Sequence, residues 1–223
     1  MILAISQAMW SEIGLGFWQT IYMTLVSTAI AYLIGIPVGV ILNISSNDGI
    51  KPNKIVNFIV GMIVNILRSV PFLILAVFLI PFTRAIIGTS IGTTAMLVPL
   101  IIAAAPYIAR MVESSLKEVD SGKIEAAHAM GSSNMNIILK VLLPEAKPSL
   151  IVGAAITTAT ILGYTAMAGF IGGGGLGDIA LKYGYYRYQN DVMLISIIVL
   201  IIIVQILQEL GLYIAKKLDK RFH

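Results

Sequence analysis

Long apolar runs separated by short polar segments dominate the pattern of this chain. Each run is about 20 residues or longer, which is the length that an α-helix needs to cross the ~30 Å hydrocarbon core of a bilayer. Five runs qualify as membrane spans: 16–42, 55–82, 89–111, 149–170 and 192–214. The pattern therefore predicts an all-α, polytopic membrane protein in which residues 1–223 form a single transmembrane domain.

Lysine and arginine residues are unevenly distributed between the predicted loops. Most of them fall in the first loop, the long third loop and the C-terminal tail, which share one side of the membrane. Cytoplasmic loops carry the excess of positive charge, so we expect the N-terminus outside and the C-terminus in the cytoplasm. The expected cytoplasmic residues are Lys51, Lys54, Arg110, Lys117, Lys123, Lys140, Lys147, Lys216, Lys217, Lys220 and Arg221, and the opposite side carries only Arg84, Lys182 and Arg187.

The composition limits the reactions that the chain can catalyse and the kinds of partner that it can bind. Hydrophobic residues make up 58% of the chain and charged residues only 12%, and the mean hydropathy of +0.93 indicates a bilayer environment. The net charge of +4 is scattered between apolar runs, so no nucleic-acid partner is expected. The chain has no cysteine and its two histidines lie far apart, so we expect no metal site and no catalytic residues. The first residues lack the features of a cleaved signal peptide, and none is expected.

The polar segment between the third and fourth predicted spans has the signals of helical structure. Ser121 is a candidate N-cap, and Gly131 stands where a glycine ends a helix in the left-handed conformation. Ser132 or Ser133 is a candidate cap for a second helix, which Pro144 then ends. We therefore expect two short helices, joined at a glycine, outside the membrane.

These two helices are too apolar to be fully exposed to water. The alanines near residue 126 leave little side-chain bulk, and Ile124, Met130, Ile138 and Leu142 supply apolar area that a partner can bury. Two interpretations stay open from these residues: a docking surface for another protein, or an amphipathic loop that lies on the bilayer surface. His128, on the first helix, is most simply a contact residue.

The same segment contains several residues whose spacing along the chain matches a known pattern. Glu125, Ala126 and Ala127 are followed after three residues by Gly131 and, after nine more, by Val141, Leu142, Leu143 and Pro144. This spacing resembles the EAA signature of ABC-type importer permeases, which has isoleucine where this chain has Val141. The resemblance implies that the cytoplasmic loop within 113–148 carries a coupling helix that docks on a separate ATPase subunit.

The resemblance extends over most of the chain and points to the permeases of methionine importers. The resembling segments are GIPVGV at 35–40, RSVPF at 68–72, IPFTRAIIGTSIG at 80–92, AAPYIARMVE at 105–113, VLLPEA at 141–146 and GGLG at 174–177. The resemblance implies a type I ABC importer permease of the bacterial inner membrane that works as a homodimer. It also implies two ATPase subunits, which bind ATP and Mg²⁺ at the cytoplasmic face, and an extracytoplasmic methionine-binding protein.

The expected function is ATP-driven uptake of D- or L-methionine, with no enzyme activity and no cofactor in this chain. Two alternatives stay open: a permease for another small amino acid, and a channel that works without ATP, although a channel would not need a docking helix. Gly172, Gly174 and Gly177 fit the nucleotide-binding pattern G-x-G-x-x-G, but no strand precedes them. We expect a flexible re-entrant turn there, and an aromatic belt or a docking surface for an external partner at 182–191.

Four residues in the predicted spans are candidates for the substrate pathway or its gate. Arg68 lies near the middle of the second span, where a charge costs ~2.5 kcal/mol or more, so it should face protein or water. With Ser69 beside it, Arg68 either attracts the substrate carboxylate or caps backbone carbonyls freed by a following proline. Tyr164 and Met167 share one face at the outer end of the fourth span, where they either close a gate between two copies or pack against a neighbouring helix.

Overall fold

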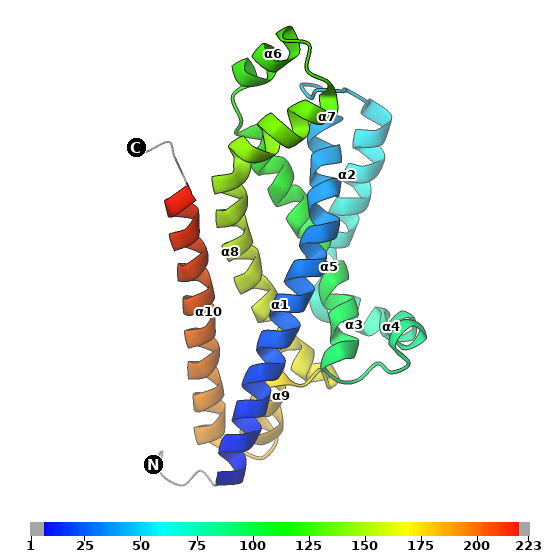
Figure 1. Cartoon of the computed structure of the whole chain (residues 1–223). Coiled ribbons are helices and arrows are strands. Elements are labelled where there is room, and N and C mark those ends of the chain that lie inside the picture. The colour runs from blue at the N-terminus through cyan, green and yellow to red at the C-terminus, as the bar shows by residue number, and fades with distance from the viewer. Residues whose placement is uncertain (1–6, 219–223) are drawn as a thin grey trace. The chain divides into compact units, whose positions relative to one another are not determined.

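The computed structural model describes residues 7–218, and all of its regular elements are helical (Figure 1). In chain order they are α1 (Gln7–Ile44), α2 (Lys54–Ser69), α3 (Phe72–Phe78), α4 (Ile80–Ile87), α5 (Thr93–Lys117), α6 (Ser121–Ala129), α7 (Asn134–Ile137), η2 (Ile138–Leu142), α8 (Leu143–Ala168), η3 (Gly169–Ile171), α9 (Gly175–Ile179), η4 (Ala180–Tyr185) and α10 (Asn190–Leu218). Segments η2 and η4 are π-helical turns. The predicted all-α class is confirmed for these residues. The first six residues and the tail residues Lys220 and Arg221, which entered the sequence predictions, lie outside the described part of the chain.

The number of membrane-spanning segments agrees with the sequence. Four helical segments are long and apolar enough to cross a membrane: α1, α5, the segment Asn134–Ile171 and α10. The pair α2 and α3 adds a fifth when the two are counted as one span. The predicted span 55–82 is broken between α2 and α3, which are bent by 101°. The break falls at Pro71, which lacks an N–H group and disfavours the helical conformation of the residue before it.

The chain divides into two compact units. The first contains Met1–Ile30, Val70–Ala104 and Thr158–Gln208, and the second contains Ala31–Ser69, Ala105–Thr157 and Glu209–His223. Helices α1, α5, α8 and α10 contribute a segment to each unit. The first unit holds the loops around α4 and α9, and the second holds the α1–α2 loop together with α6 and α7. That residues 1–223 form a single domain stays a prediction.

The first unit is built around two buried apolar clusters. One joins Met23 of α1 to Phe72 of α3 and Leu100 of α5, and the other joins Leu176 of α9 to Ile203 of α10. Between helices in a membrane, such contacts stabilise through close packing, because lipid tails are as apolar as the side chains.

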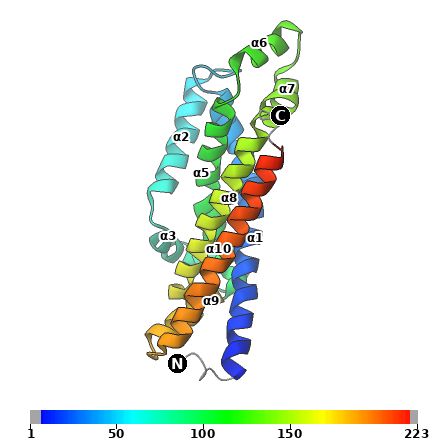
Figure 2. The same cartoon turned by 90° about the vertical axis from the view of Figure 1, so that its left-hand side faces the viewer.

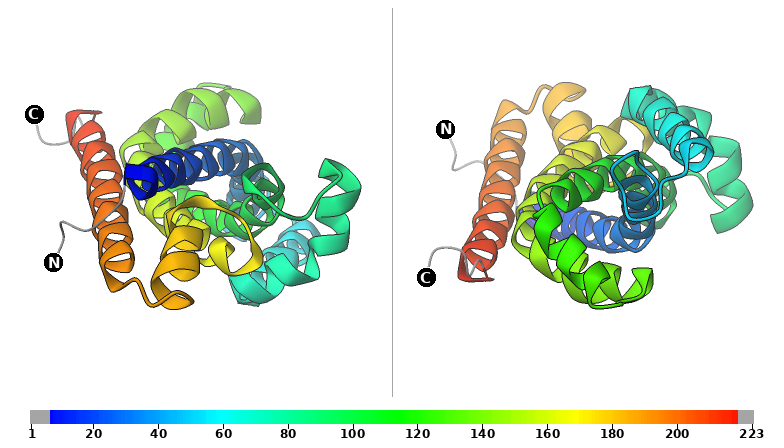
Figure 3. Two further views of the ribbon diagram at one scale, coloured as in Figure 1. Left: turned by 90° about the horizontal axis from the view of Figure 1, so that it is seen from below. Right: turned by 90° about the horizontal axis from the view of Figure 1, so that it is seen from above.

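The glycine segment before α9 is fixed against α1 within the first unit (Figure 3, left). The N–H groups of Gly175 and Leu176 donate to Gln19 Oε1 at 2.8 Å and Thr20 Oγ1 at 2.9 Å, so two side chains of α1 cap the start of α9. Gly174 and Gly175 have φ values of 76° and 82°, which L side chains rarely adopt. The expected flexible turn is therefore a hydrogen-bonded turn whose backbone conformation requires glycine.

In the second unit, α2 runs beside the C-terminal part of α5 (Figure 2), and α1 packs on the same stretch of α5. Gly39 allows this approach, because a Cβ there would lie 2.6 Å from the Ala109 carbonyl oxygen. Leu42, Val64 and Ala109 form the buried centre of the three helices. The Asn57 amide donates to the Leu42 carbonyl at 2.8 Å, which binds the start of α2 to the end of α1.

Candidate functional site

Helix α6 is a short capped helix outside the candidate spans. It lies beside the loop that joins α1 to α2, with which it lines a cleft. The side chain of Asp120 accepts a hydrogen bond from the Gly122 N–H at 2.7 Å, so Asp120 is the N-cap. The predicted cap, Ser121, is wrong by one residue, because the carboxylate of Asp120 reaches the free N–H group first.

The end of α6 is a glycine turn, as the sequence predicts. Gly131 has φ of 76°, and its N–H donates to the His128 carbonyl at 2.9 Å. The next N–H, of Ser132, donates to the Ala127 carbonyl at 3.1 Å. These two bonds form a Schellman motif, which stops the helix and satisfies its last carbonyl groups.

Helices α7 and α8 form one continuous helical segment through the π turn η2. Ser133 caps α7 by accepting from the Asn136 N–H at 3.4 Å, as predicted. Pro144 does not end the helix, because η2 precedes it and α8 already begins at Leu143. A π turn bonds each N–H to the fifth residue before it and so accommodates a residue without an N–H group. The predicted separate second helix is therefore wrong: the segment continues directly into the fourth span.

An apolar surface is exposed around the turn between α6 and α7. Met130, Met135 and Leu139 have exposed fractions of 79%, 62% and 56%. Leu142, which was expected to supply part of this surface, is only 1% exposed because it packs inside its own chain. Met130 lies outside the candidate spans, and Met135 and Leu139 lie in the first turns of the candidate span Asn134–Ile171. Large apolar side chains gathered at such an exposed turn are typical of a protein-binding surface.

Residues of the EAA signature occupy different environments. Glu125, Ala126, Gly131 and Pro144 are exposed, Leu143 is half-buried, and Ala127 is buried. The exposed residues are available to a partner, whereas Ala127 packs within the segment itself. Lys123 Nζ lies 2.6 Å from Glu145 Oε2, so an ion pair connects α6 to the first turn of α8.

A cleft of about 930 Å³ opens beside α6 in the second unit. Its walls are the α1–α2 loop, the start of α2, the end of α5 and one face of α6. Asp48, Lys54, Glu125 and His128 are among its polar lining residues. Glu125 of the signature therefore borders a concave surface, and His128 is a lining residue, as expected for a contact position. Among residues 7–218, no group of three or more metal-ligating side chains lies together.

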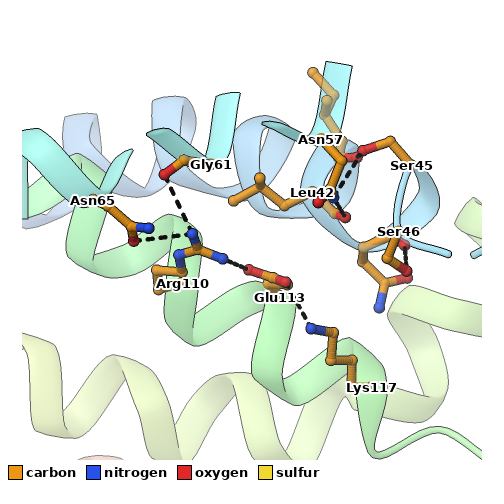
Figure 4. Close-up of polar contacts among 11 residues, drawn as sticks. Leu42, Ser45, Ser46, Asn57, Gly61, Asn65, Arg110, Glu113 and Lys117 are labelled. Atoms are coloured by element: carbon orange, nitrogen blue, oxygen red, sulfur yellow. Dashed lines mark hydrogen bonds and ion pairs between the residues drawn. The ribbon is translucent and has the colours of Figure 1, made fainter. Parts of the chain in front are cut away.

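A polar cluster joins α5 to α2 in the second unit (Figure 4). Glu113, whose side chain is 7% exposed, accepts from Arg110 Nη1 at 2.6 Å and from Lys117 Nζ at 2.7 Å. Arg110 Nη2 also donates to the Gly61 carbonyl at 3.3 Å and to Asn65 Oδ1 at 2.9 Å. Two cations thus compensate the buried carboxylate, and the remaining donors of Arg110 bind α2.

Sequence reasoning missed this cluster. Arg110, Glu113 and Lys117 are spaced three and four residues apart, which places them on one face of a helix, and this spacing was the available signal. Their partners on α2 had no comparable signal, because Gly61 offers only a backbone carbonyl and Asn65 is an ordinary polar residue in an apolar run.

Arg68 and Ser69 lie in the last turn of α2 and are both exposed. The Arg68 guanidinium lies over the Tyr107 ring, with 5.9 Å between Cζ and the ring centroid. In the described part of the chain it makes no hydrogen bond to a backbone carbonyl, so the structure gives no support to a capping role. The Ser69 hydroxyl donates to the Asn65 carbonyl at 2.8 Å.

The two candidate gate residues differ in their surroundings. Tyr164 stacks on Phe72 within the first unit, with 4.9 Å between ring centroids and an interplanar angle of 6°. Met167 is 46% exposed and projects from the unit. Met167 is thus the more exposed of the two, and Tyr164 is half-buried. The role of both residues in a gate stays a prediction.

Exposed aromatic rings gather after α9 in the first unit. Tyr185, Tyr186 and Tyr188 are 62%, 68% and 87% exposed, and the Arg187 guanidinium lies 4.8 Å from the centroid of the Tyr183 ring. These rings form the exposed surface that both sequence interpretations, an interfacial belt and a docking surface, require.

Asp178 is the titratable group of α9, in the same unit. Burial raises the pKa of its carboxyl group, and the positive charge of Lys182, one turn further along, offsets part of this effect. The net effect is that the Asp178 carboxyl group binds its proton more tightly than an exposed aspartic acid does.

The family model of binding-protein-dependent transport system inner membrane components matches residues 35–222. The chain is similar to the probable D-methionine transport system permease protein MetI of Vibrio cholerae, with 48% identity over 204 residues, 92% of this chain and 91% of that protein. It is similar to the methionine import system permease protein MetP of Bacillus subtilis, with 44% identity over 211 residues, 95% of each chain. A solved structure of inward-facing conformations of the MetNI methionine ABC transporter contains a chain with a TM-score of 0.95 and 47% identity, covering 97% of this chain and 100% of that chain.

Proposed function

Since the chain belongs to the family of binding-protein-dependent transport system inner membrane components, we propose that it is the permease subunit of an ATP-driven methionine importer. It is a multi-pass inner-membrane protein with the fold of type I ABC importer permeases. The subunit provides the translocation pathway, and ATP hydrolysis belongs to a separate ATPase subunit. The observation that carries the proposal is the α6 segment, a capped helix with an exposed apolar surface outside the spans.

Coupling to the ATPase follows from the continuity of the helical segment. The exposed residues of the signature, together with Met130, Met135 and Leu139, form the surface that docks on the ATPase. Because α7 continues through η2 into α8, a displacement of the docked segment reaches a membrane-spanning helix without an intervening loop. The ion pair between Lys123 and Glu145 keeps α6 attached to this segment during the displacement.

The assembly contains two copies of this chain and two ATPase subunits, which bind ATP and Mg²⁺. Each chain carries one coupling segment, so an ATPase dimer with two docking sites requires two permease chains, most simply identical ones. An extracytoplasmic methionine-binding protein delivers the substrate. The excess of Lys and Arg in three of the loops supports a cytoplasmic position for those loops, with the N-terminus outside. In this orientation the exposed tyrosines after α9 are available to that binding protein.

Uptake by proteoliposomes tests the proposed function. Vesicles that contain this chain, its ATPase and its binding protein should accumulate radiolabelled methionine only when ATP is present on the ATPase side. A catalytically inactive ATPase is the control and should abolish accumulation. Uptake that does not depend on ATP would favour a channel, and preferential uptake of another amino acid would favour a different importer; either result contradicts the proposal.

A further inference from the structure

Two arginines of the second unit differ in how their charges are compensated. Arg110 pairs with Glu113 at 2.6 Å and donates to two further oxygens of α2. Arg68 is exposed, and its guanidinium lies over the Tyr107 ring. No carboxylate among residues 7–218 forms an ion pair with Arg68. The N–H donors of its guanidinium are therefore unused within this part of the chain.

An unpaired arginine is costly in this position. Arg68 belongs to the pair of helices, α2 and α3, that together form a candidate membrane span. A guanidinium at the centre of a bilayer costs ~2.5–3.5 kcal/mol even on insertion scales, so it faces a water-filled or protein environment and needs a polar or anionic partner. Residues 7–218 supply no such anion, so the exposed guanidinium of Arg68 is open to water and to an anionic ligand.

Arg68 shares one face of α2 with two other polar side chains. Asn65 lies three residues before Arg68 and four residues before Ser69, so it is a surface neighbour of both, and all three are exposed. The Asn65 side-chain oxygen accepts from Arg110 Nη2 at 2.9 Å, so its NH₂ group is left as a donor (Figure 4). The face therefore offers a charged donor and a neutral donor about one helical turn apart.

We propose that this face, formed by Asn65, Arg68 and Ser69, binds the carboxylate of the transported amino acid during its passage. The inference rests on the proposed function, since it assigns a binding site within the same pathway. A guanidinium matches a carboxylate through two parallel N–H groups, and Asn65 adds a third donor. Arg110 does not compete for the substrate, because its charge is compensated by Glu113 and its donors orient Asn65.

Equilibrium binding to the purified permease–ATPase complex in nanodiscs tests this assignment. The binding protein is left out, so that only the membrane subunits discriminate between ligands. The probe is radiolabelled methionine, and the competitors are methionine and its carboxamide, which lacks the carboxylate. The wild-type complex should prefer methionine by about tenfold or more, the loss expected when a charge-assisted hydrogen bond is removed.

Variants of α2 should change this preference in a graded way. Arg68→Gln should weaken methionine binding by about tenfold or more and bring the two competitors to similar affinities. Arg68→Lys, which keeps the charge without the bidentate geometry, should retain part of the preference. Lys51→Gln removes the same charge from the exposed α1–α2 loop and should leave the preference unchanged.

Three results would overturn the assignment. They are an unchanged preference in Arg68→Gln, no saturable binding by the wild-type complex, and loss of permease dimers in Arg68→Gln by native mass spectrometry. The last result would mean that Arg68 pairs with the second copy of the chain. ATP-dependent uptake by the wild-type complex is measured separately, so failure of the carboxylate site leaves the proposed function standing.

Discussion

Replacement of Gly131 by valine tests whether the turn between α6 and α7 fixes the coupling segment. The residue has φ of 76°, and a Cβ at this position would meet no atom within 4 Å. Valine therefore changes the backbone preference of the turn and leaves its packing unaffected. An L residue in the left-handed conformation costs about 1–2 kcal/mol, and a β-branched residue lies at the upper end of that range. This free energy lowers the population of the native turn roughly 5- to 30-fold relative to competing conformations.

We expect the Gly131→Val complex to insert into membranes while its transport-stimulated ATP hydrolysis and its co-purification with the ATPase fall by a similar factor. Gly131→Asn is the matched control, because asparagine tolerates the left-handed conformation and also adds a side chain at this open position. The asparagine variant should keep most of the stimulated hydrolysis. Equal hydrolysis by the two variants, whether normal or reduced, would refute the reasoning, since backbone preference would then not set coupling.

Three further changes test the first unit. Gly177→Ala should lower the unfolding temperature of the chain in detergent, because the new Cβ would lie 2.2 Å from the Ala166 carbonyl oxygen. Gly163→Ala is the control and should leave the unfolding temperature unchanged, because a Cβ there would meet no atom within 4 Å. Equal unfolding temperatures of the two variants would contradict this packing. Burial raises the pKa of the Asp178 carboxyl group above its ordinary value of 3.8, so the folded chain binds this proton more tightly than the unfolded chain does. The free energy of unfolding should therefore decrease as pH rises from the pKa of the unfolded chain to the higher pKa of the folded chain. Asp178→Asn should remove this pH dependence and raise the unfolding temperature at neutral pH, and a variant with the wild-type dependence would contradict the assignment. Met167→Cys, in a chain without native cysteine, should crosslink two copies in the resting complex and not when ATP is trapped; no crosslink in either state would remove Met167 from the two-fold axis.

Features set by neighbouring residues could be predicted from the sequence. The long apolar runs identify the spans because a helix needs a fixed length to cross a bilayer. Gly131 and Ser133 identify the end of α6 and the start of α7, because left-handed glycines and serine caps act within one turn of the chain. The error at Ser121 is of one residue, since Asp120 is an equally suitable cap.

Features set by packing and by helix geometry could not be predicted in this way. A proline such as Pro144 often ends a helix, but here a π turn precedes it and α7 and α8 continue as one segment. Leu142 falls on the helix face that packs against its own chain, whereas Leu139 falls on the exposed face. The extra residue of a π turn rotates every later side chain, so ordinary helical periodicity assigns the wrong residues to the partner surface.

The charges in the spans show most clearly why the sequence was insufficient. From the sequence, Arg68 lies near the middle of a span and Arg110 is assigned to the cytoplasmic side, and neither assignment says which groups compensate the charge. The answer for Arg110 depends on Asn65 and Gly61, which lie 45 and 49 residues away in the chain. Once Glu113 and these two residues are seen to bind Arg110, Arg68 stands out as the cation in the last turn of α2 that has no ion pair among the described residues. Under the carboxylate-site proposal, the guanidinium of Arg68 and the unused amide donor of Asn65 are the groups that bind the carboxylate of the transported amino acid.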